Sequence, residues 1–234
     1  MDVFSAAEAR KLIDSDRAVI LECGSNDGAD TQAFLDAFPS PDTLILCFEC
    51  DRRAIERWQA RIHDPRAILY PAAVGEIDGF VPFHPSAGSP PGPQWIGYGE
   101  WDKSGSLLPP DKHSEYDPWL RFNDTVRVPC YRLDTVLPND HEVFARIHDA
   151  GGVDVIWSDL QGFDAAMLRG AQAIVSATKY VYAEIHHRKL YKGQSKFHEV
   201  QEALPGFCLK WMYAGDNFLF RRCNWLACDS QLDS

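Results

Sequence analysis

The sequence has no excess of basic residues. Its 23 lysine and arginine residues are outnumbered by 34 aspartate and glutamate residues, which leaves a formal net charge of −11. A protein that clamps nucleic acid through its phosphates needs a basic face, so nucleic acid is not an expected partner. The local cluster of Arg188, Lys189, Lys192 and Lys196 is more typical of a solvated entry to a helix.

Long apolar runs are also missing. No stretch of 18 consecutive apolar residues exists, and the first residues, 1–16, are polar and lack the apolar core of a signal peptide. We therefore expect no membrane span and a cytoplasmic location.

The cysteines do not have the pattern of a secreted disulfide framework. Their number is odd, and most lie inside strand-like apolar runs, which predicts buried thiols. Cys47 and Cys50 have CxxC spacing, but no second CxxC exists to complete a zinc site, so a structural pair is favoured over a redox or metal site. The seven cysteines are Cys23, Cys47, Cys50, Cys130, Cys208, Cys223 and Cys228.

Short apolar runs alternate with helical patterns along the chain. At 234 residues and 45% hydrophobic content, the chain has the size of one α/β domain covering residues 1–234. Such alternation predicts a mostly parallel sheet with helices on both faces, closed by an antiparallel pair at residues 207–221. The other expected strands are 18–21, 44–48, 67–70, 153–157 and 180–183, and the expected helices include 29–38, 54–62, 163–174 and 195–204, with β-like pieces at 80–83 and 126–133.

One segment, residues 82–129, breaks this regularity. It holds nine of the fifteen prolines and three of the seven tryptophans. An irregular loop of nearly fifty residues is uncommon without a function of its own, so we interpret the segment as an insertion that has one.

Two acidic residues and a glycine turn lie where ligands bind in such sheets, beyond the carboxyl ends of the strands. Gly24 to Gly28 form G-x-x-x-G after a strand. The dinucleotide-binding fingerprint G-x-G-x-x-G has glycine where this chain has Asn26, and the third glycine of the fingerprint is missing from this chain. Glu22 before the turn would repel a pyrophosphate and suit a cationic aminoacyl sulfonium. Glu49, at the end of the second strand, could accept hydrogen bonds from a ribose diol. The alternative is that both acids are solvated loop residues.

An ordered series of motifs between residues 18 and 220 resembles the FkbM family of methyltransferases. The resemblance implies a class I Rossmann-like fold and a methyltransferase that uses S-adenosylmethionine to methylate hydroxyl oxygens of sugars or natural products. The motifs are Ile20-Leu-Glu-Cys-Gly-Ser-Asn-Asp-Gly28, Cys47-Phe-Glu-Cys-Asp51, Pro71-Ala-Ala-Val-Gly75, Leu133-Asp134, Val155-Ile-Trp-Ser-Asp-Leu-Gln-Gly162, Leu168-Arg-Gly-Ala171 and Ala183-Glu184.

The same resemblance implies a set of cofactor-binding residues. The glycine turn with Glu22 would hold the methionine portion, Glu49 the ribose and residues 72–74 the adenine. The chain departs from the family at Trp157, where lysine is frequent, and at 161–164, where Glu-Gly-Ala-Glu is frequent. The implied residues are Glu22, Gly24, Ser25, Asn26, Gly28, Glu49, Cys50, Ala72, Ala73, Val74, Ser106 and Asp159.

Methyl transfer to an alcohol benefits from a general base, and few candidates lie at the ligand edge. Asp159 follows one strand, and Glu184 and His186 follow its expected neighbour. We predict that Asp159 and His186 contact the substrate hydroxyl, with Glu184 beside them. These three residues also have the chemistry of a divalent-cation site, but we do not favour a metal.

The acceptor is expected to bind under the 82–129 insertion. Trp95, Trp101, Trp119 and His113 are the predicted acceptor contacts, because aromatic rings stack on sugar faces. The competing interpretation is a small core that packs the insertion itself or a contact between subunits of a homo-oligomer. Two other functions stay open: a nicotinamide-dependent oxidoreductase and a non-catalytic carbohydrate-binding protein.

Overall fold

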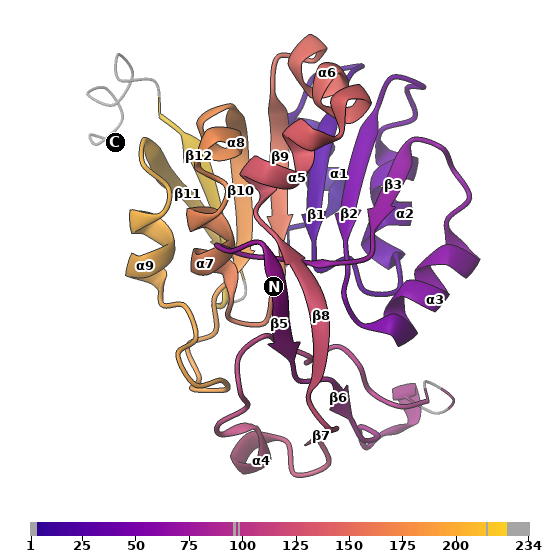
Figure 1. The fold of residues 1–234 in the computed structure, drawn as a ribbon, viewed down its shortest axis with the longest axis vertical. Coiled ribbons are helices and arrows are strands. Elements are labelled where there is room, and N and C mark those ends of the chain that lie inside the picture. Colours follow the sequence, from indigo (N-terminus) through magenta and orange to yellow (C-terminus); the bar gives the residue numbers. More distant parts are fainter. Residues whose placement is uncertain (1–3, 96, 98, 214, 224–234) are drawn as a thin grey trace.

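A seven-stranded sheet organises the part of the chain that the computed structural model describes, residues 4–95, 97, 99–213 and 215–223 (Figure 1). The strand order is β11-β12-β10-β9-β1-β2-β3, and only β12 runs antiparallel to its neighbours. This confirms the predicted fold class. The strands are β1 (Val19–Cys23), β2 (Leu44–Phe48), β3 (Ala67–Tyr70), β9 (Val153–Ser158), β10 (Thr178–Glu184), β11 (Phe207–Tyr213) and β12 (Asn217–Arg222).

The strand order reverses beside β1. From β1 the chain builds outward through β2 and β3, and it later returns to place β9 on the other side of β1. Crossovers to the two sides leave this point open at the carboxyl ends of the strands, where α/β sheets bind ligands. In Figure 1 the arrowhead of β9 points to this edge.

Helices cover both faces of the sheet because every central strand is apolar on both sides. Ile20 packs with the helices of one face and Leu21 with those of the other. No helix in the described ranges is long and apolar enough to cross a membrane. One face carries α1 (Ala6–Leu12), α2 (Ala29–Ala37) and α3 (Arg52–Arg61), and the other carries α5 (Leu133–Asn139), α6 (His141–Asp149), α7 (Asp164–Arg169), α8 (Gln172–Ser176) and α9 (Phe197–Glu202).

Two of the expected elements differ from those observed. The helix expected over 163–174 is split into α7 and α8 at Gly170, where a Cβ would lie 1.9 Å from the carbonyl oxygen of Gly75. The β-like piece expected over 126–133 ends at Tyr131, and Leu133 already begins α5. Neither α5, which contains Pro138, nor α6 was indicated by the sequence pattern.

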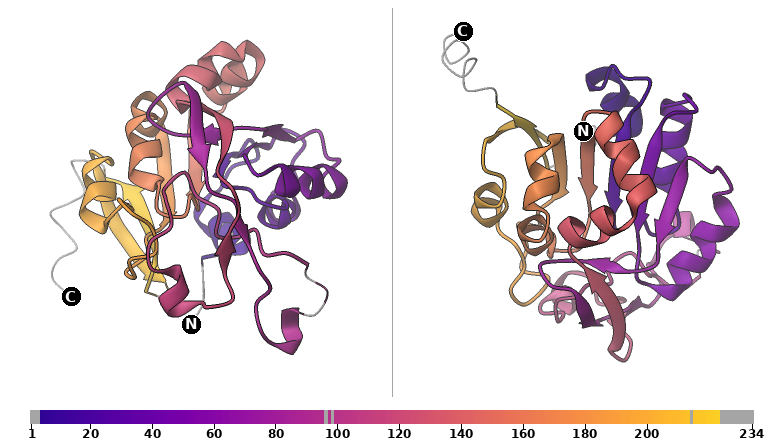
Figure 2. Two further views of the ribbon diagram at one scale, coloured as in Figure 1. Left: turned by 60° about the horizontal axis from the view of Figure 1, so that its bottom comes forward. Right: turned by 45° about the horizontal axis from the view of Figure 1, so that its top comes forward.

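The insertion forms two small sheets at the ligand edge. When that edge is turned toward the viewer, the insertion lies in front of the main sheet (Figure 2, left). The three-stranded sheet β4-β8-β5 joins the insertion to the domain, and a short ribbon, β6 with β7, extends it. The elements are β4 (Ala73–Val74), β5 (Gly79–Phe83), β6 (Ser86–Ala87), the 3₁₀ turn η1 (Pro93–Trp95), α4 (His113–Tyr116), β7 (Arg121–Phe122) and β8 (Val126–Tyr131).

The three tryptophans of the insertion pack against one another. Trp101 contacts Trp95 and Trp119 edge to face, with ring centroids 5.1 and 5.4 Å apart. Such edge-to-face pairs help to stabilise the insertion. This arrangement favours the interpretation of a small core over that of a sugar-stacking platform.

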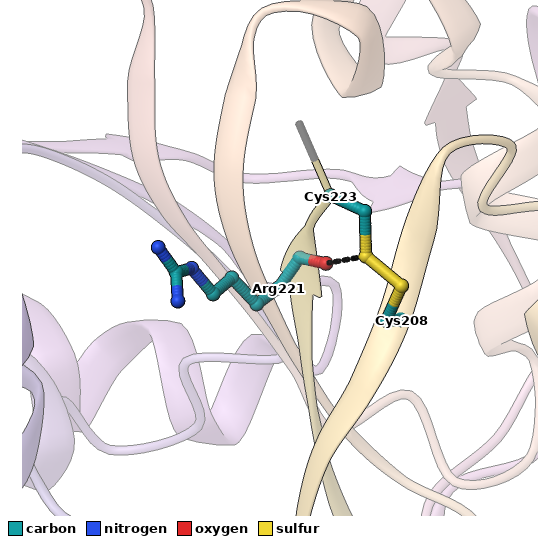
Figure 3. Close-up of a disulfide and its surroundings, with 3 residues drawn as sticks. All are labelled: Cys208, Arg221 and Cys223. Atoms are coloured by element: carbon teal, nitrogen blue, oxygen red, sulfur yellow. Dashed lines mark hydrogen bonds between the residues drawn. A yellow bond between two sulfur atoms is a disulfide. The ribbon is translucent and has the colours of Figure 1, made fainter. Parts of the chain in front are cut away.

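The prediction of unpaired thiols is wrong for two cysteines. Cys208 in β11 and Cys223 after β12 form a disulfide, with Cα atoms 6.0 Å apart (Figure 3). They lie on neighbouring antiparallel strands, a pairing that a list of cysteine positions does not show. Cys23, Cys47, Cys50 and Cys130 are free, and Cys228 lies outside the described residues.

A buried carboxylate connects three of the central strands, and we predict its contribution to stability. Asp154 in β9 accepts hydrogen bonds from the Val19 backbone N–H (2.9 Å) and from Lys179 Nζ (2.7 Å). Asp154→Ala should reduce the free energy of unfolding by about 1–3 kcal/mol, because it leaves the Val19 N–H buried and unpaired. Urea unfolding measures this. Asp154→Asn keeps an oxygen that accepts the Val19 N–H, so its free energy of unfolding should fall less than that of Asp154→Ala. Equal decreases in the two variants would contradict the explanation.

Candidate active site

A cavity opens at the carboxyl ends of β1, β2 and β9, and most residues predicted to bind a cofactor line it. Glu22 and Gly28 are the two predicted residues that do not. Those that line the cavity are Gly24, Ser25, Asn26, Glu49, Cys50, Ala72, Ala73, Val74, Ser106 and Asp159.

The glycine turn after β1 is in close backbone contact with the residue that follows β9. Gly24 has φ +88°, and a Cβ there would lie 2.1 Å from the carbonyl oxygen of Asp159. Only glycine allows this approach. The contact places Asp159 beside the glycine turn.

Gly28 has a packing role. It begins α2 with φ +77°, and a Cβ would lie 2.8 Å from Cδ1 of Trp58. The residue therefore lets α2 lie close to α3, and it lies outside the cavity.

Glu22 lies beneath the cavity, under α2. Thr31 Oγ1 donates a hydrogen bond to its carboxyl at 2.5 Å, and the Cys47 thiol lies 3.4 Å away. Burial raises the pKa of Glu22 to about 8. The expectation that Glu22 presents a negative charge to a cationic ligand is therefore corrected: the residue is buried, mostly protonated at neutral pH, and connects β1 to α2.

Glu49 is held rigidly at the cavity wall. Its Oε1 accepts the backbone N–H groups of Cys50 and Asp51, both at 2.7 Å, and its Oε2 accepts that of Asn26 at 2.9 Å. Burial raises the pKa of Glu49 to about 6, although these donors favour the ionised form. A carboxylate oxygen accepts about two hydrogen bonds, so Oε1 is filled by these two N–H groups, while Oε2 keeps capacity for a ribose hydroxyl.

Two buried polar atoms in the glycine turn have no hydrogen-bond partner among the described residues. They are Ser25 Oγ and Asn26 Oδ1, and both residues line the cavity. Unpaired buried polar atoms cost free energy, so their presence in a cavity wall indicates a polar ligand. Asn26 also has φ +43°, a conformation found at many functional sites.

The insertion supplies another wall of the cavity. Ser106 Oγ donates a hydrogen bond to the Gln161 carbonyl at 2.9 Å, which ties the insertion to the loop after β9. Asp102, Lys103 and Leu107 line the cavity as well, although no sequence motif pointed to them. The insertion thus contacts the site through residues 102–107.

Gln161 was not among the predicted site residues, yet it connects them. Its Nε2 donates to Asp159 Oδ1 (2.6 Å) and to Glu184 Oε2 (3.3 Å), and the Tyr191 hydroxyl lies 2.8 Å from its Oε1. Its backbone has φ +50°, which a non-glycine residue rarely adopts. The following Gly162 was the one available sequence signal for a tight turn here.

Asp159, Glu184 and His186 are brought together as predicted. His186 Nδ1 lies 3.9 Å from Glu184 Oε1. Burial and the carboxyl of Asp159 hold the pKa of Glu184 well above its usual range, and burial lowers the pKa of His186. His186 lines none of the cavities described here, so its predicted direct contact with a substrate hydroxyl has no support from the geometry.

The four predicted acceptor contacts lie elsewhere. Trp95, Trp101, Trp119 and His113 do not line the cavity. His113 packs edge to face on Tyr191 at 4.6 Å, and burial, with the nearby His186, lowers its pKa to about 4.

Within the described part of the chain, no group of three or more His, Cys, Asp and Glu side chains has the arrangement to hold a metal ion.

Comparisons with known proteins identify the family. The model of the methyltransferase FkbM domain matches residues 22–213. The 2-O-methyltransferase NoeI of Sinorhizobium fredii (strain NBRC 101917 / NGR234) is 32% identical over 200 residues, 84% of this chain and 74% of that protein. The crystal structure of the methyltransferase FkbM from Methylobacillus flagellatus KT superposes with a TM-score of 0.53 at 13% identity.

That alignment covers 94% of this chain, which spans about half (48%) of the Methylobacillus protein. At this identity the superposition shows the fold, and the match of the family model over most of the chain shows the family. The chain therefore belongs to the FkbM family of methyltransferases, the family and enzyme class that its sequence motifs predict.

Proposed function

We propose that the protein is an S-adenosylmethionine-dependent O-methyltransferase that methylates a hydroxyl group of a sugar or a natural product. The observation that carries the proposal is the family match combined with a cavity whose wall holds Glu49 and two unpaired polar atoms, on Ser25 and Asn26. The name of the related NoeI, a 2-O-methyltransferase, supports a hydroxyl oxygen as the acceptor.

The residues around the cavity fit the three parts of the cofactor. Ser25 Oγ and Asn26 Oδ1 would pair with the amino-acid end, and Glu49 with the ribose hydroxyls. The adenine would lie against Ala72, Ala73 and Val74. When bound, the cofactor supplies an electrophilic methyl group on a sulfonium.

In this proposal Asp159 is the general base. It lines the cavity at the end of β9, and Gln161 Nε2 orients its carboxylate. Asp159 would accept the proton of the acceptor hydroxyl, while a bound cofactor would supply the methyl group to the hydroxyl oxygen and keep its sulfur as a neutral thioether. Positioning of the two reactants supplies most of the rate enhancement, and the general base adds a further factor of about 10²–10⁴.

Glu184 and His186 support this base. Because burial and the neighbouring Asp159 raise the pKa of Glu184, Glu184 carries a proton at neutral pH. His186 is neutral, since burial lowers its pKa, and it packs beside Glu184. We assign both residues to positioning the Asp159 carboxyl group.

The alternatives fit the cavity less well. A nicotinamide dinucleotide needs room for its pyrophosphate at the glycine turn, and Asn26 occupies the position where that motif has glycine. A non-catalytic carbohydrate-binding protein would not need the oriented carboxylate of Glu49.

Affinity for S-adenosylhomocysteine should depend on the ionisation of Glu49. The ribose hydroxyls donate to the carboxylate, so binding favours the ionised form, and protonation below the pKa of about 6 opposes it. Isothermal titration calorimetry should show Kd rising about tenfold from pH 7 to pH 5. Glu49→Gln should weaken binding about 10- to 100-fold at pH 7 and remove this pH dependence.

The exposed Glu56→Gln is the matched control and should bind like the wild type. Glu22 does not contribute to the change, because its pKa of about 8 keeps it protonated across this range. Absence of binding to S-adenosylhomocysteine, with NADH quenching tryptophan fluorescence, would overturn the proposal in favour of an oxidoreductase.

Removal of the proposed base should lower the turnover number and leave the affinity for S-adenosylhomocysteine nearly unchanged. Asp159→Asn should lower kcat for tritiated methyl transfer by about 10²–10⁴, with Kd for S-adenosylhomocysteine within a few-fold of wild type. Asp42→Asn, an exposed carboxylate in the turn before β2, should change neither quantity. Wild-type kcat in Asp159→Asn would exclude Asp159 as the base.

A further inference from the structure

A second cavity lies on the other side of Asp159 from the insertion. Its volume is about 480 Å³, within the ~300–1,000 Å³ of typical ligand sites. It opens between Phe4, which precedes α1, the carboxyl ends of β9 and β10, and the first residue of β12. The residues that line it are Phe4, Ser5, Ala6, Asp30, Ala33, Trp157, Asp159, Tyr182, Glu184 and Asn217.

Asp30 and Asp159 line both cavities, so they form the boundary between them. A molecule in the second cavity would therefore reach the same carboxylate that faces the proposed cofactor site. Glu184 lines only the second cavity, and Gln161 connects it to Asp159. The proposed base and its carboxyl partner thus both face this second space.

One side of the second cavity is a stack of aromatic rings. The rings of Trp157 and Tyr182 stack at 4.1 Å with an interplanar angle of 29°, and Phe4 stacks on Trp157 at 5.6 Å. These residues are 2–7% exposed and belong to the core. They form an apolar floor that limits the cavity on this side, and their ring faces contact one another.

The remaining wall is rich in hydrogen-bond acceptors. Asp30, Asp159 and Glu184 contribute carboxyl groups, and Asn217 contributes an amide whose Oδ1 already accepts a hydrogen bond from the Tyr182 hydroxyl. Several acceptors around one small space suit a molecule with several hydroxyl donors. Because Glu184 carries a proton, the wall has less negative charge than its residue types suggest, which suits a neutral polyol better than a cation.

We propose that this second cavity is the acceptor site and that its occupant is a neutral saccharide unit, held by the acceptor-rich wall with a hydroxyl group at Asp159. This inference rests on the proposed function and adds the location and class of the acceptor. It differs from the expectation that the tryptophans of the insertion bind the acceptor, since those rings contact one another and do not line either cavity.

Ala33 offers a way to block the second cavity alone. It is an exposed residue of α2 that lines the second cavity and not the first. Ala33→Phe should therefore fill the acceptor space without disturbing the fold or the cofactor site. Asp36→Phe, exposed on the same helix and outside both cavities, is the matched control.

The experiment measures tritiated methyl transfer from S-adenosylmethionine to a panel of neutral methyl glycosides of hexoses, 6-deoxyhexoses and pentoses, with 2-amino-2-deoxy analogues alongside. Wild type should methylate at least one neutral glycoside on oxygen. Ala33→Phe should lower kcat/KM for that glycoside on the order of 100-fold. Its Kd for S-adenosylhomocysteine should stay within twofold of wild type, and Asp36→Phe should retain both properties.

Three results would overturn the proposal while the wild-type protein still binds S-adenosylhomocysteine. They are unchanged kcat/KM in Ala33→Phe, methylation of nitrogen on the amino analogues only, and no methylation of any glycoside. Loss of S-adenosylhomocysteine binding in the wild type would instead refute the proposed function. The two failures are therefore distinguishable.

Discussion

The close contact between the glycine turn after β1 and the end of β9 is the constraint on which the site depends. Gly24 approaches the Asp159 carbonyl so closely that any side chain would collide with backbone, and backbone atoms cannot move aside as a side-chain end can. The same turn is tied to β2, because Glu49 accepts the Asn26 N–H and the Phe48 carbonyl accepts the Gly24 N–H. One tight turn therefore positions the ends of three strands.

Polar side chains extend this arrangement into a connected network. Gln161, in a backbone conformation that costs free energy, holds Asp159 and Glu184 with one amide group. Ser106 of the insertion holds that loop in place, because its hydroxyl donates a hydrogen bond to the Gln161 carbonyl. The insertion thus acts on the site through hydrogen bonding, while its tryptophans serve its own stability.

The acidic residues at the strand ends lie in different surroundings and have different roles. Glu22 is buried and mostly protonated, Glu49 is held by three backbone N–H groups, and Glu184 shares its surroundings with Asp159. Trp157, where the family resemblance leads one to expect lysine, belongs to the aromatic floor of the second cavity. That departure removes a cation from the site and replaces it with apolar surface.

The sequence by itself determined the sheet, the family and the strand-end residues around the first cavity, because apolar periodicity and glycine spacing are local properties. Only the tertiary structure decided where side chains point. It buried Glu22 under α2, paired Cys208 with Cys223 across β11 and β12, and brought Gln161 between two carboxyls. It also joined Phe4 and Asn217, from opposite ends of the chain, in one cavity. Burial and distance between residues far apart in sequence set these outcomes, and no local pattern encodes them.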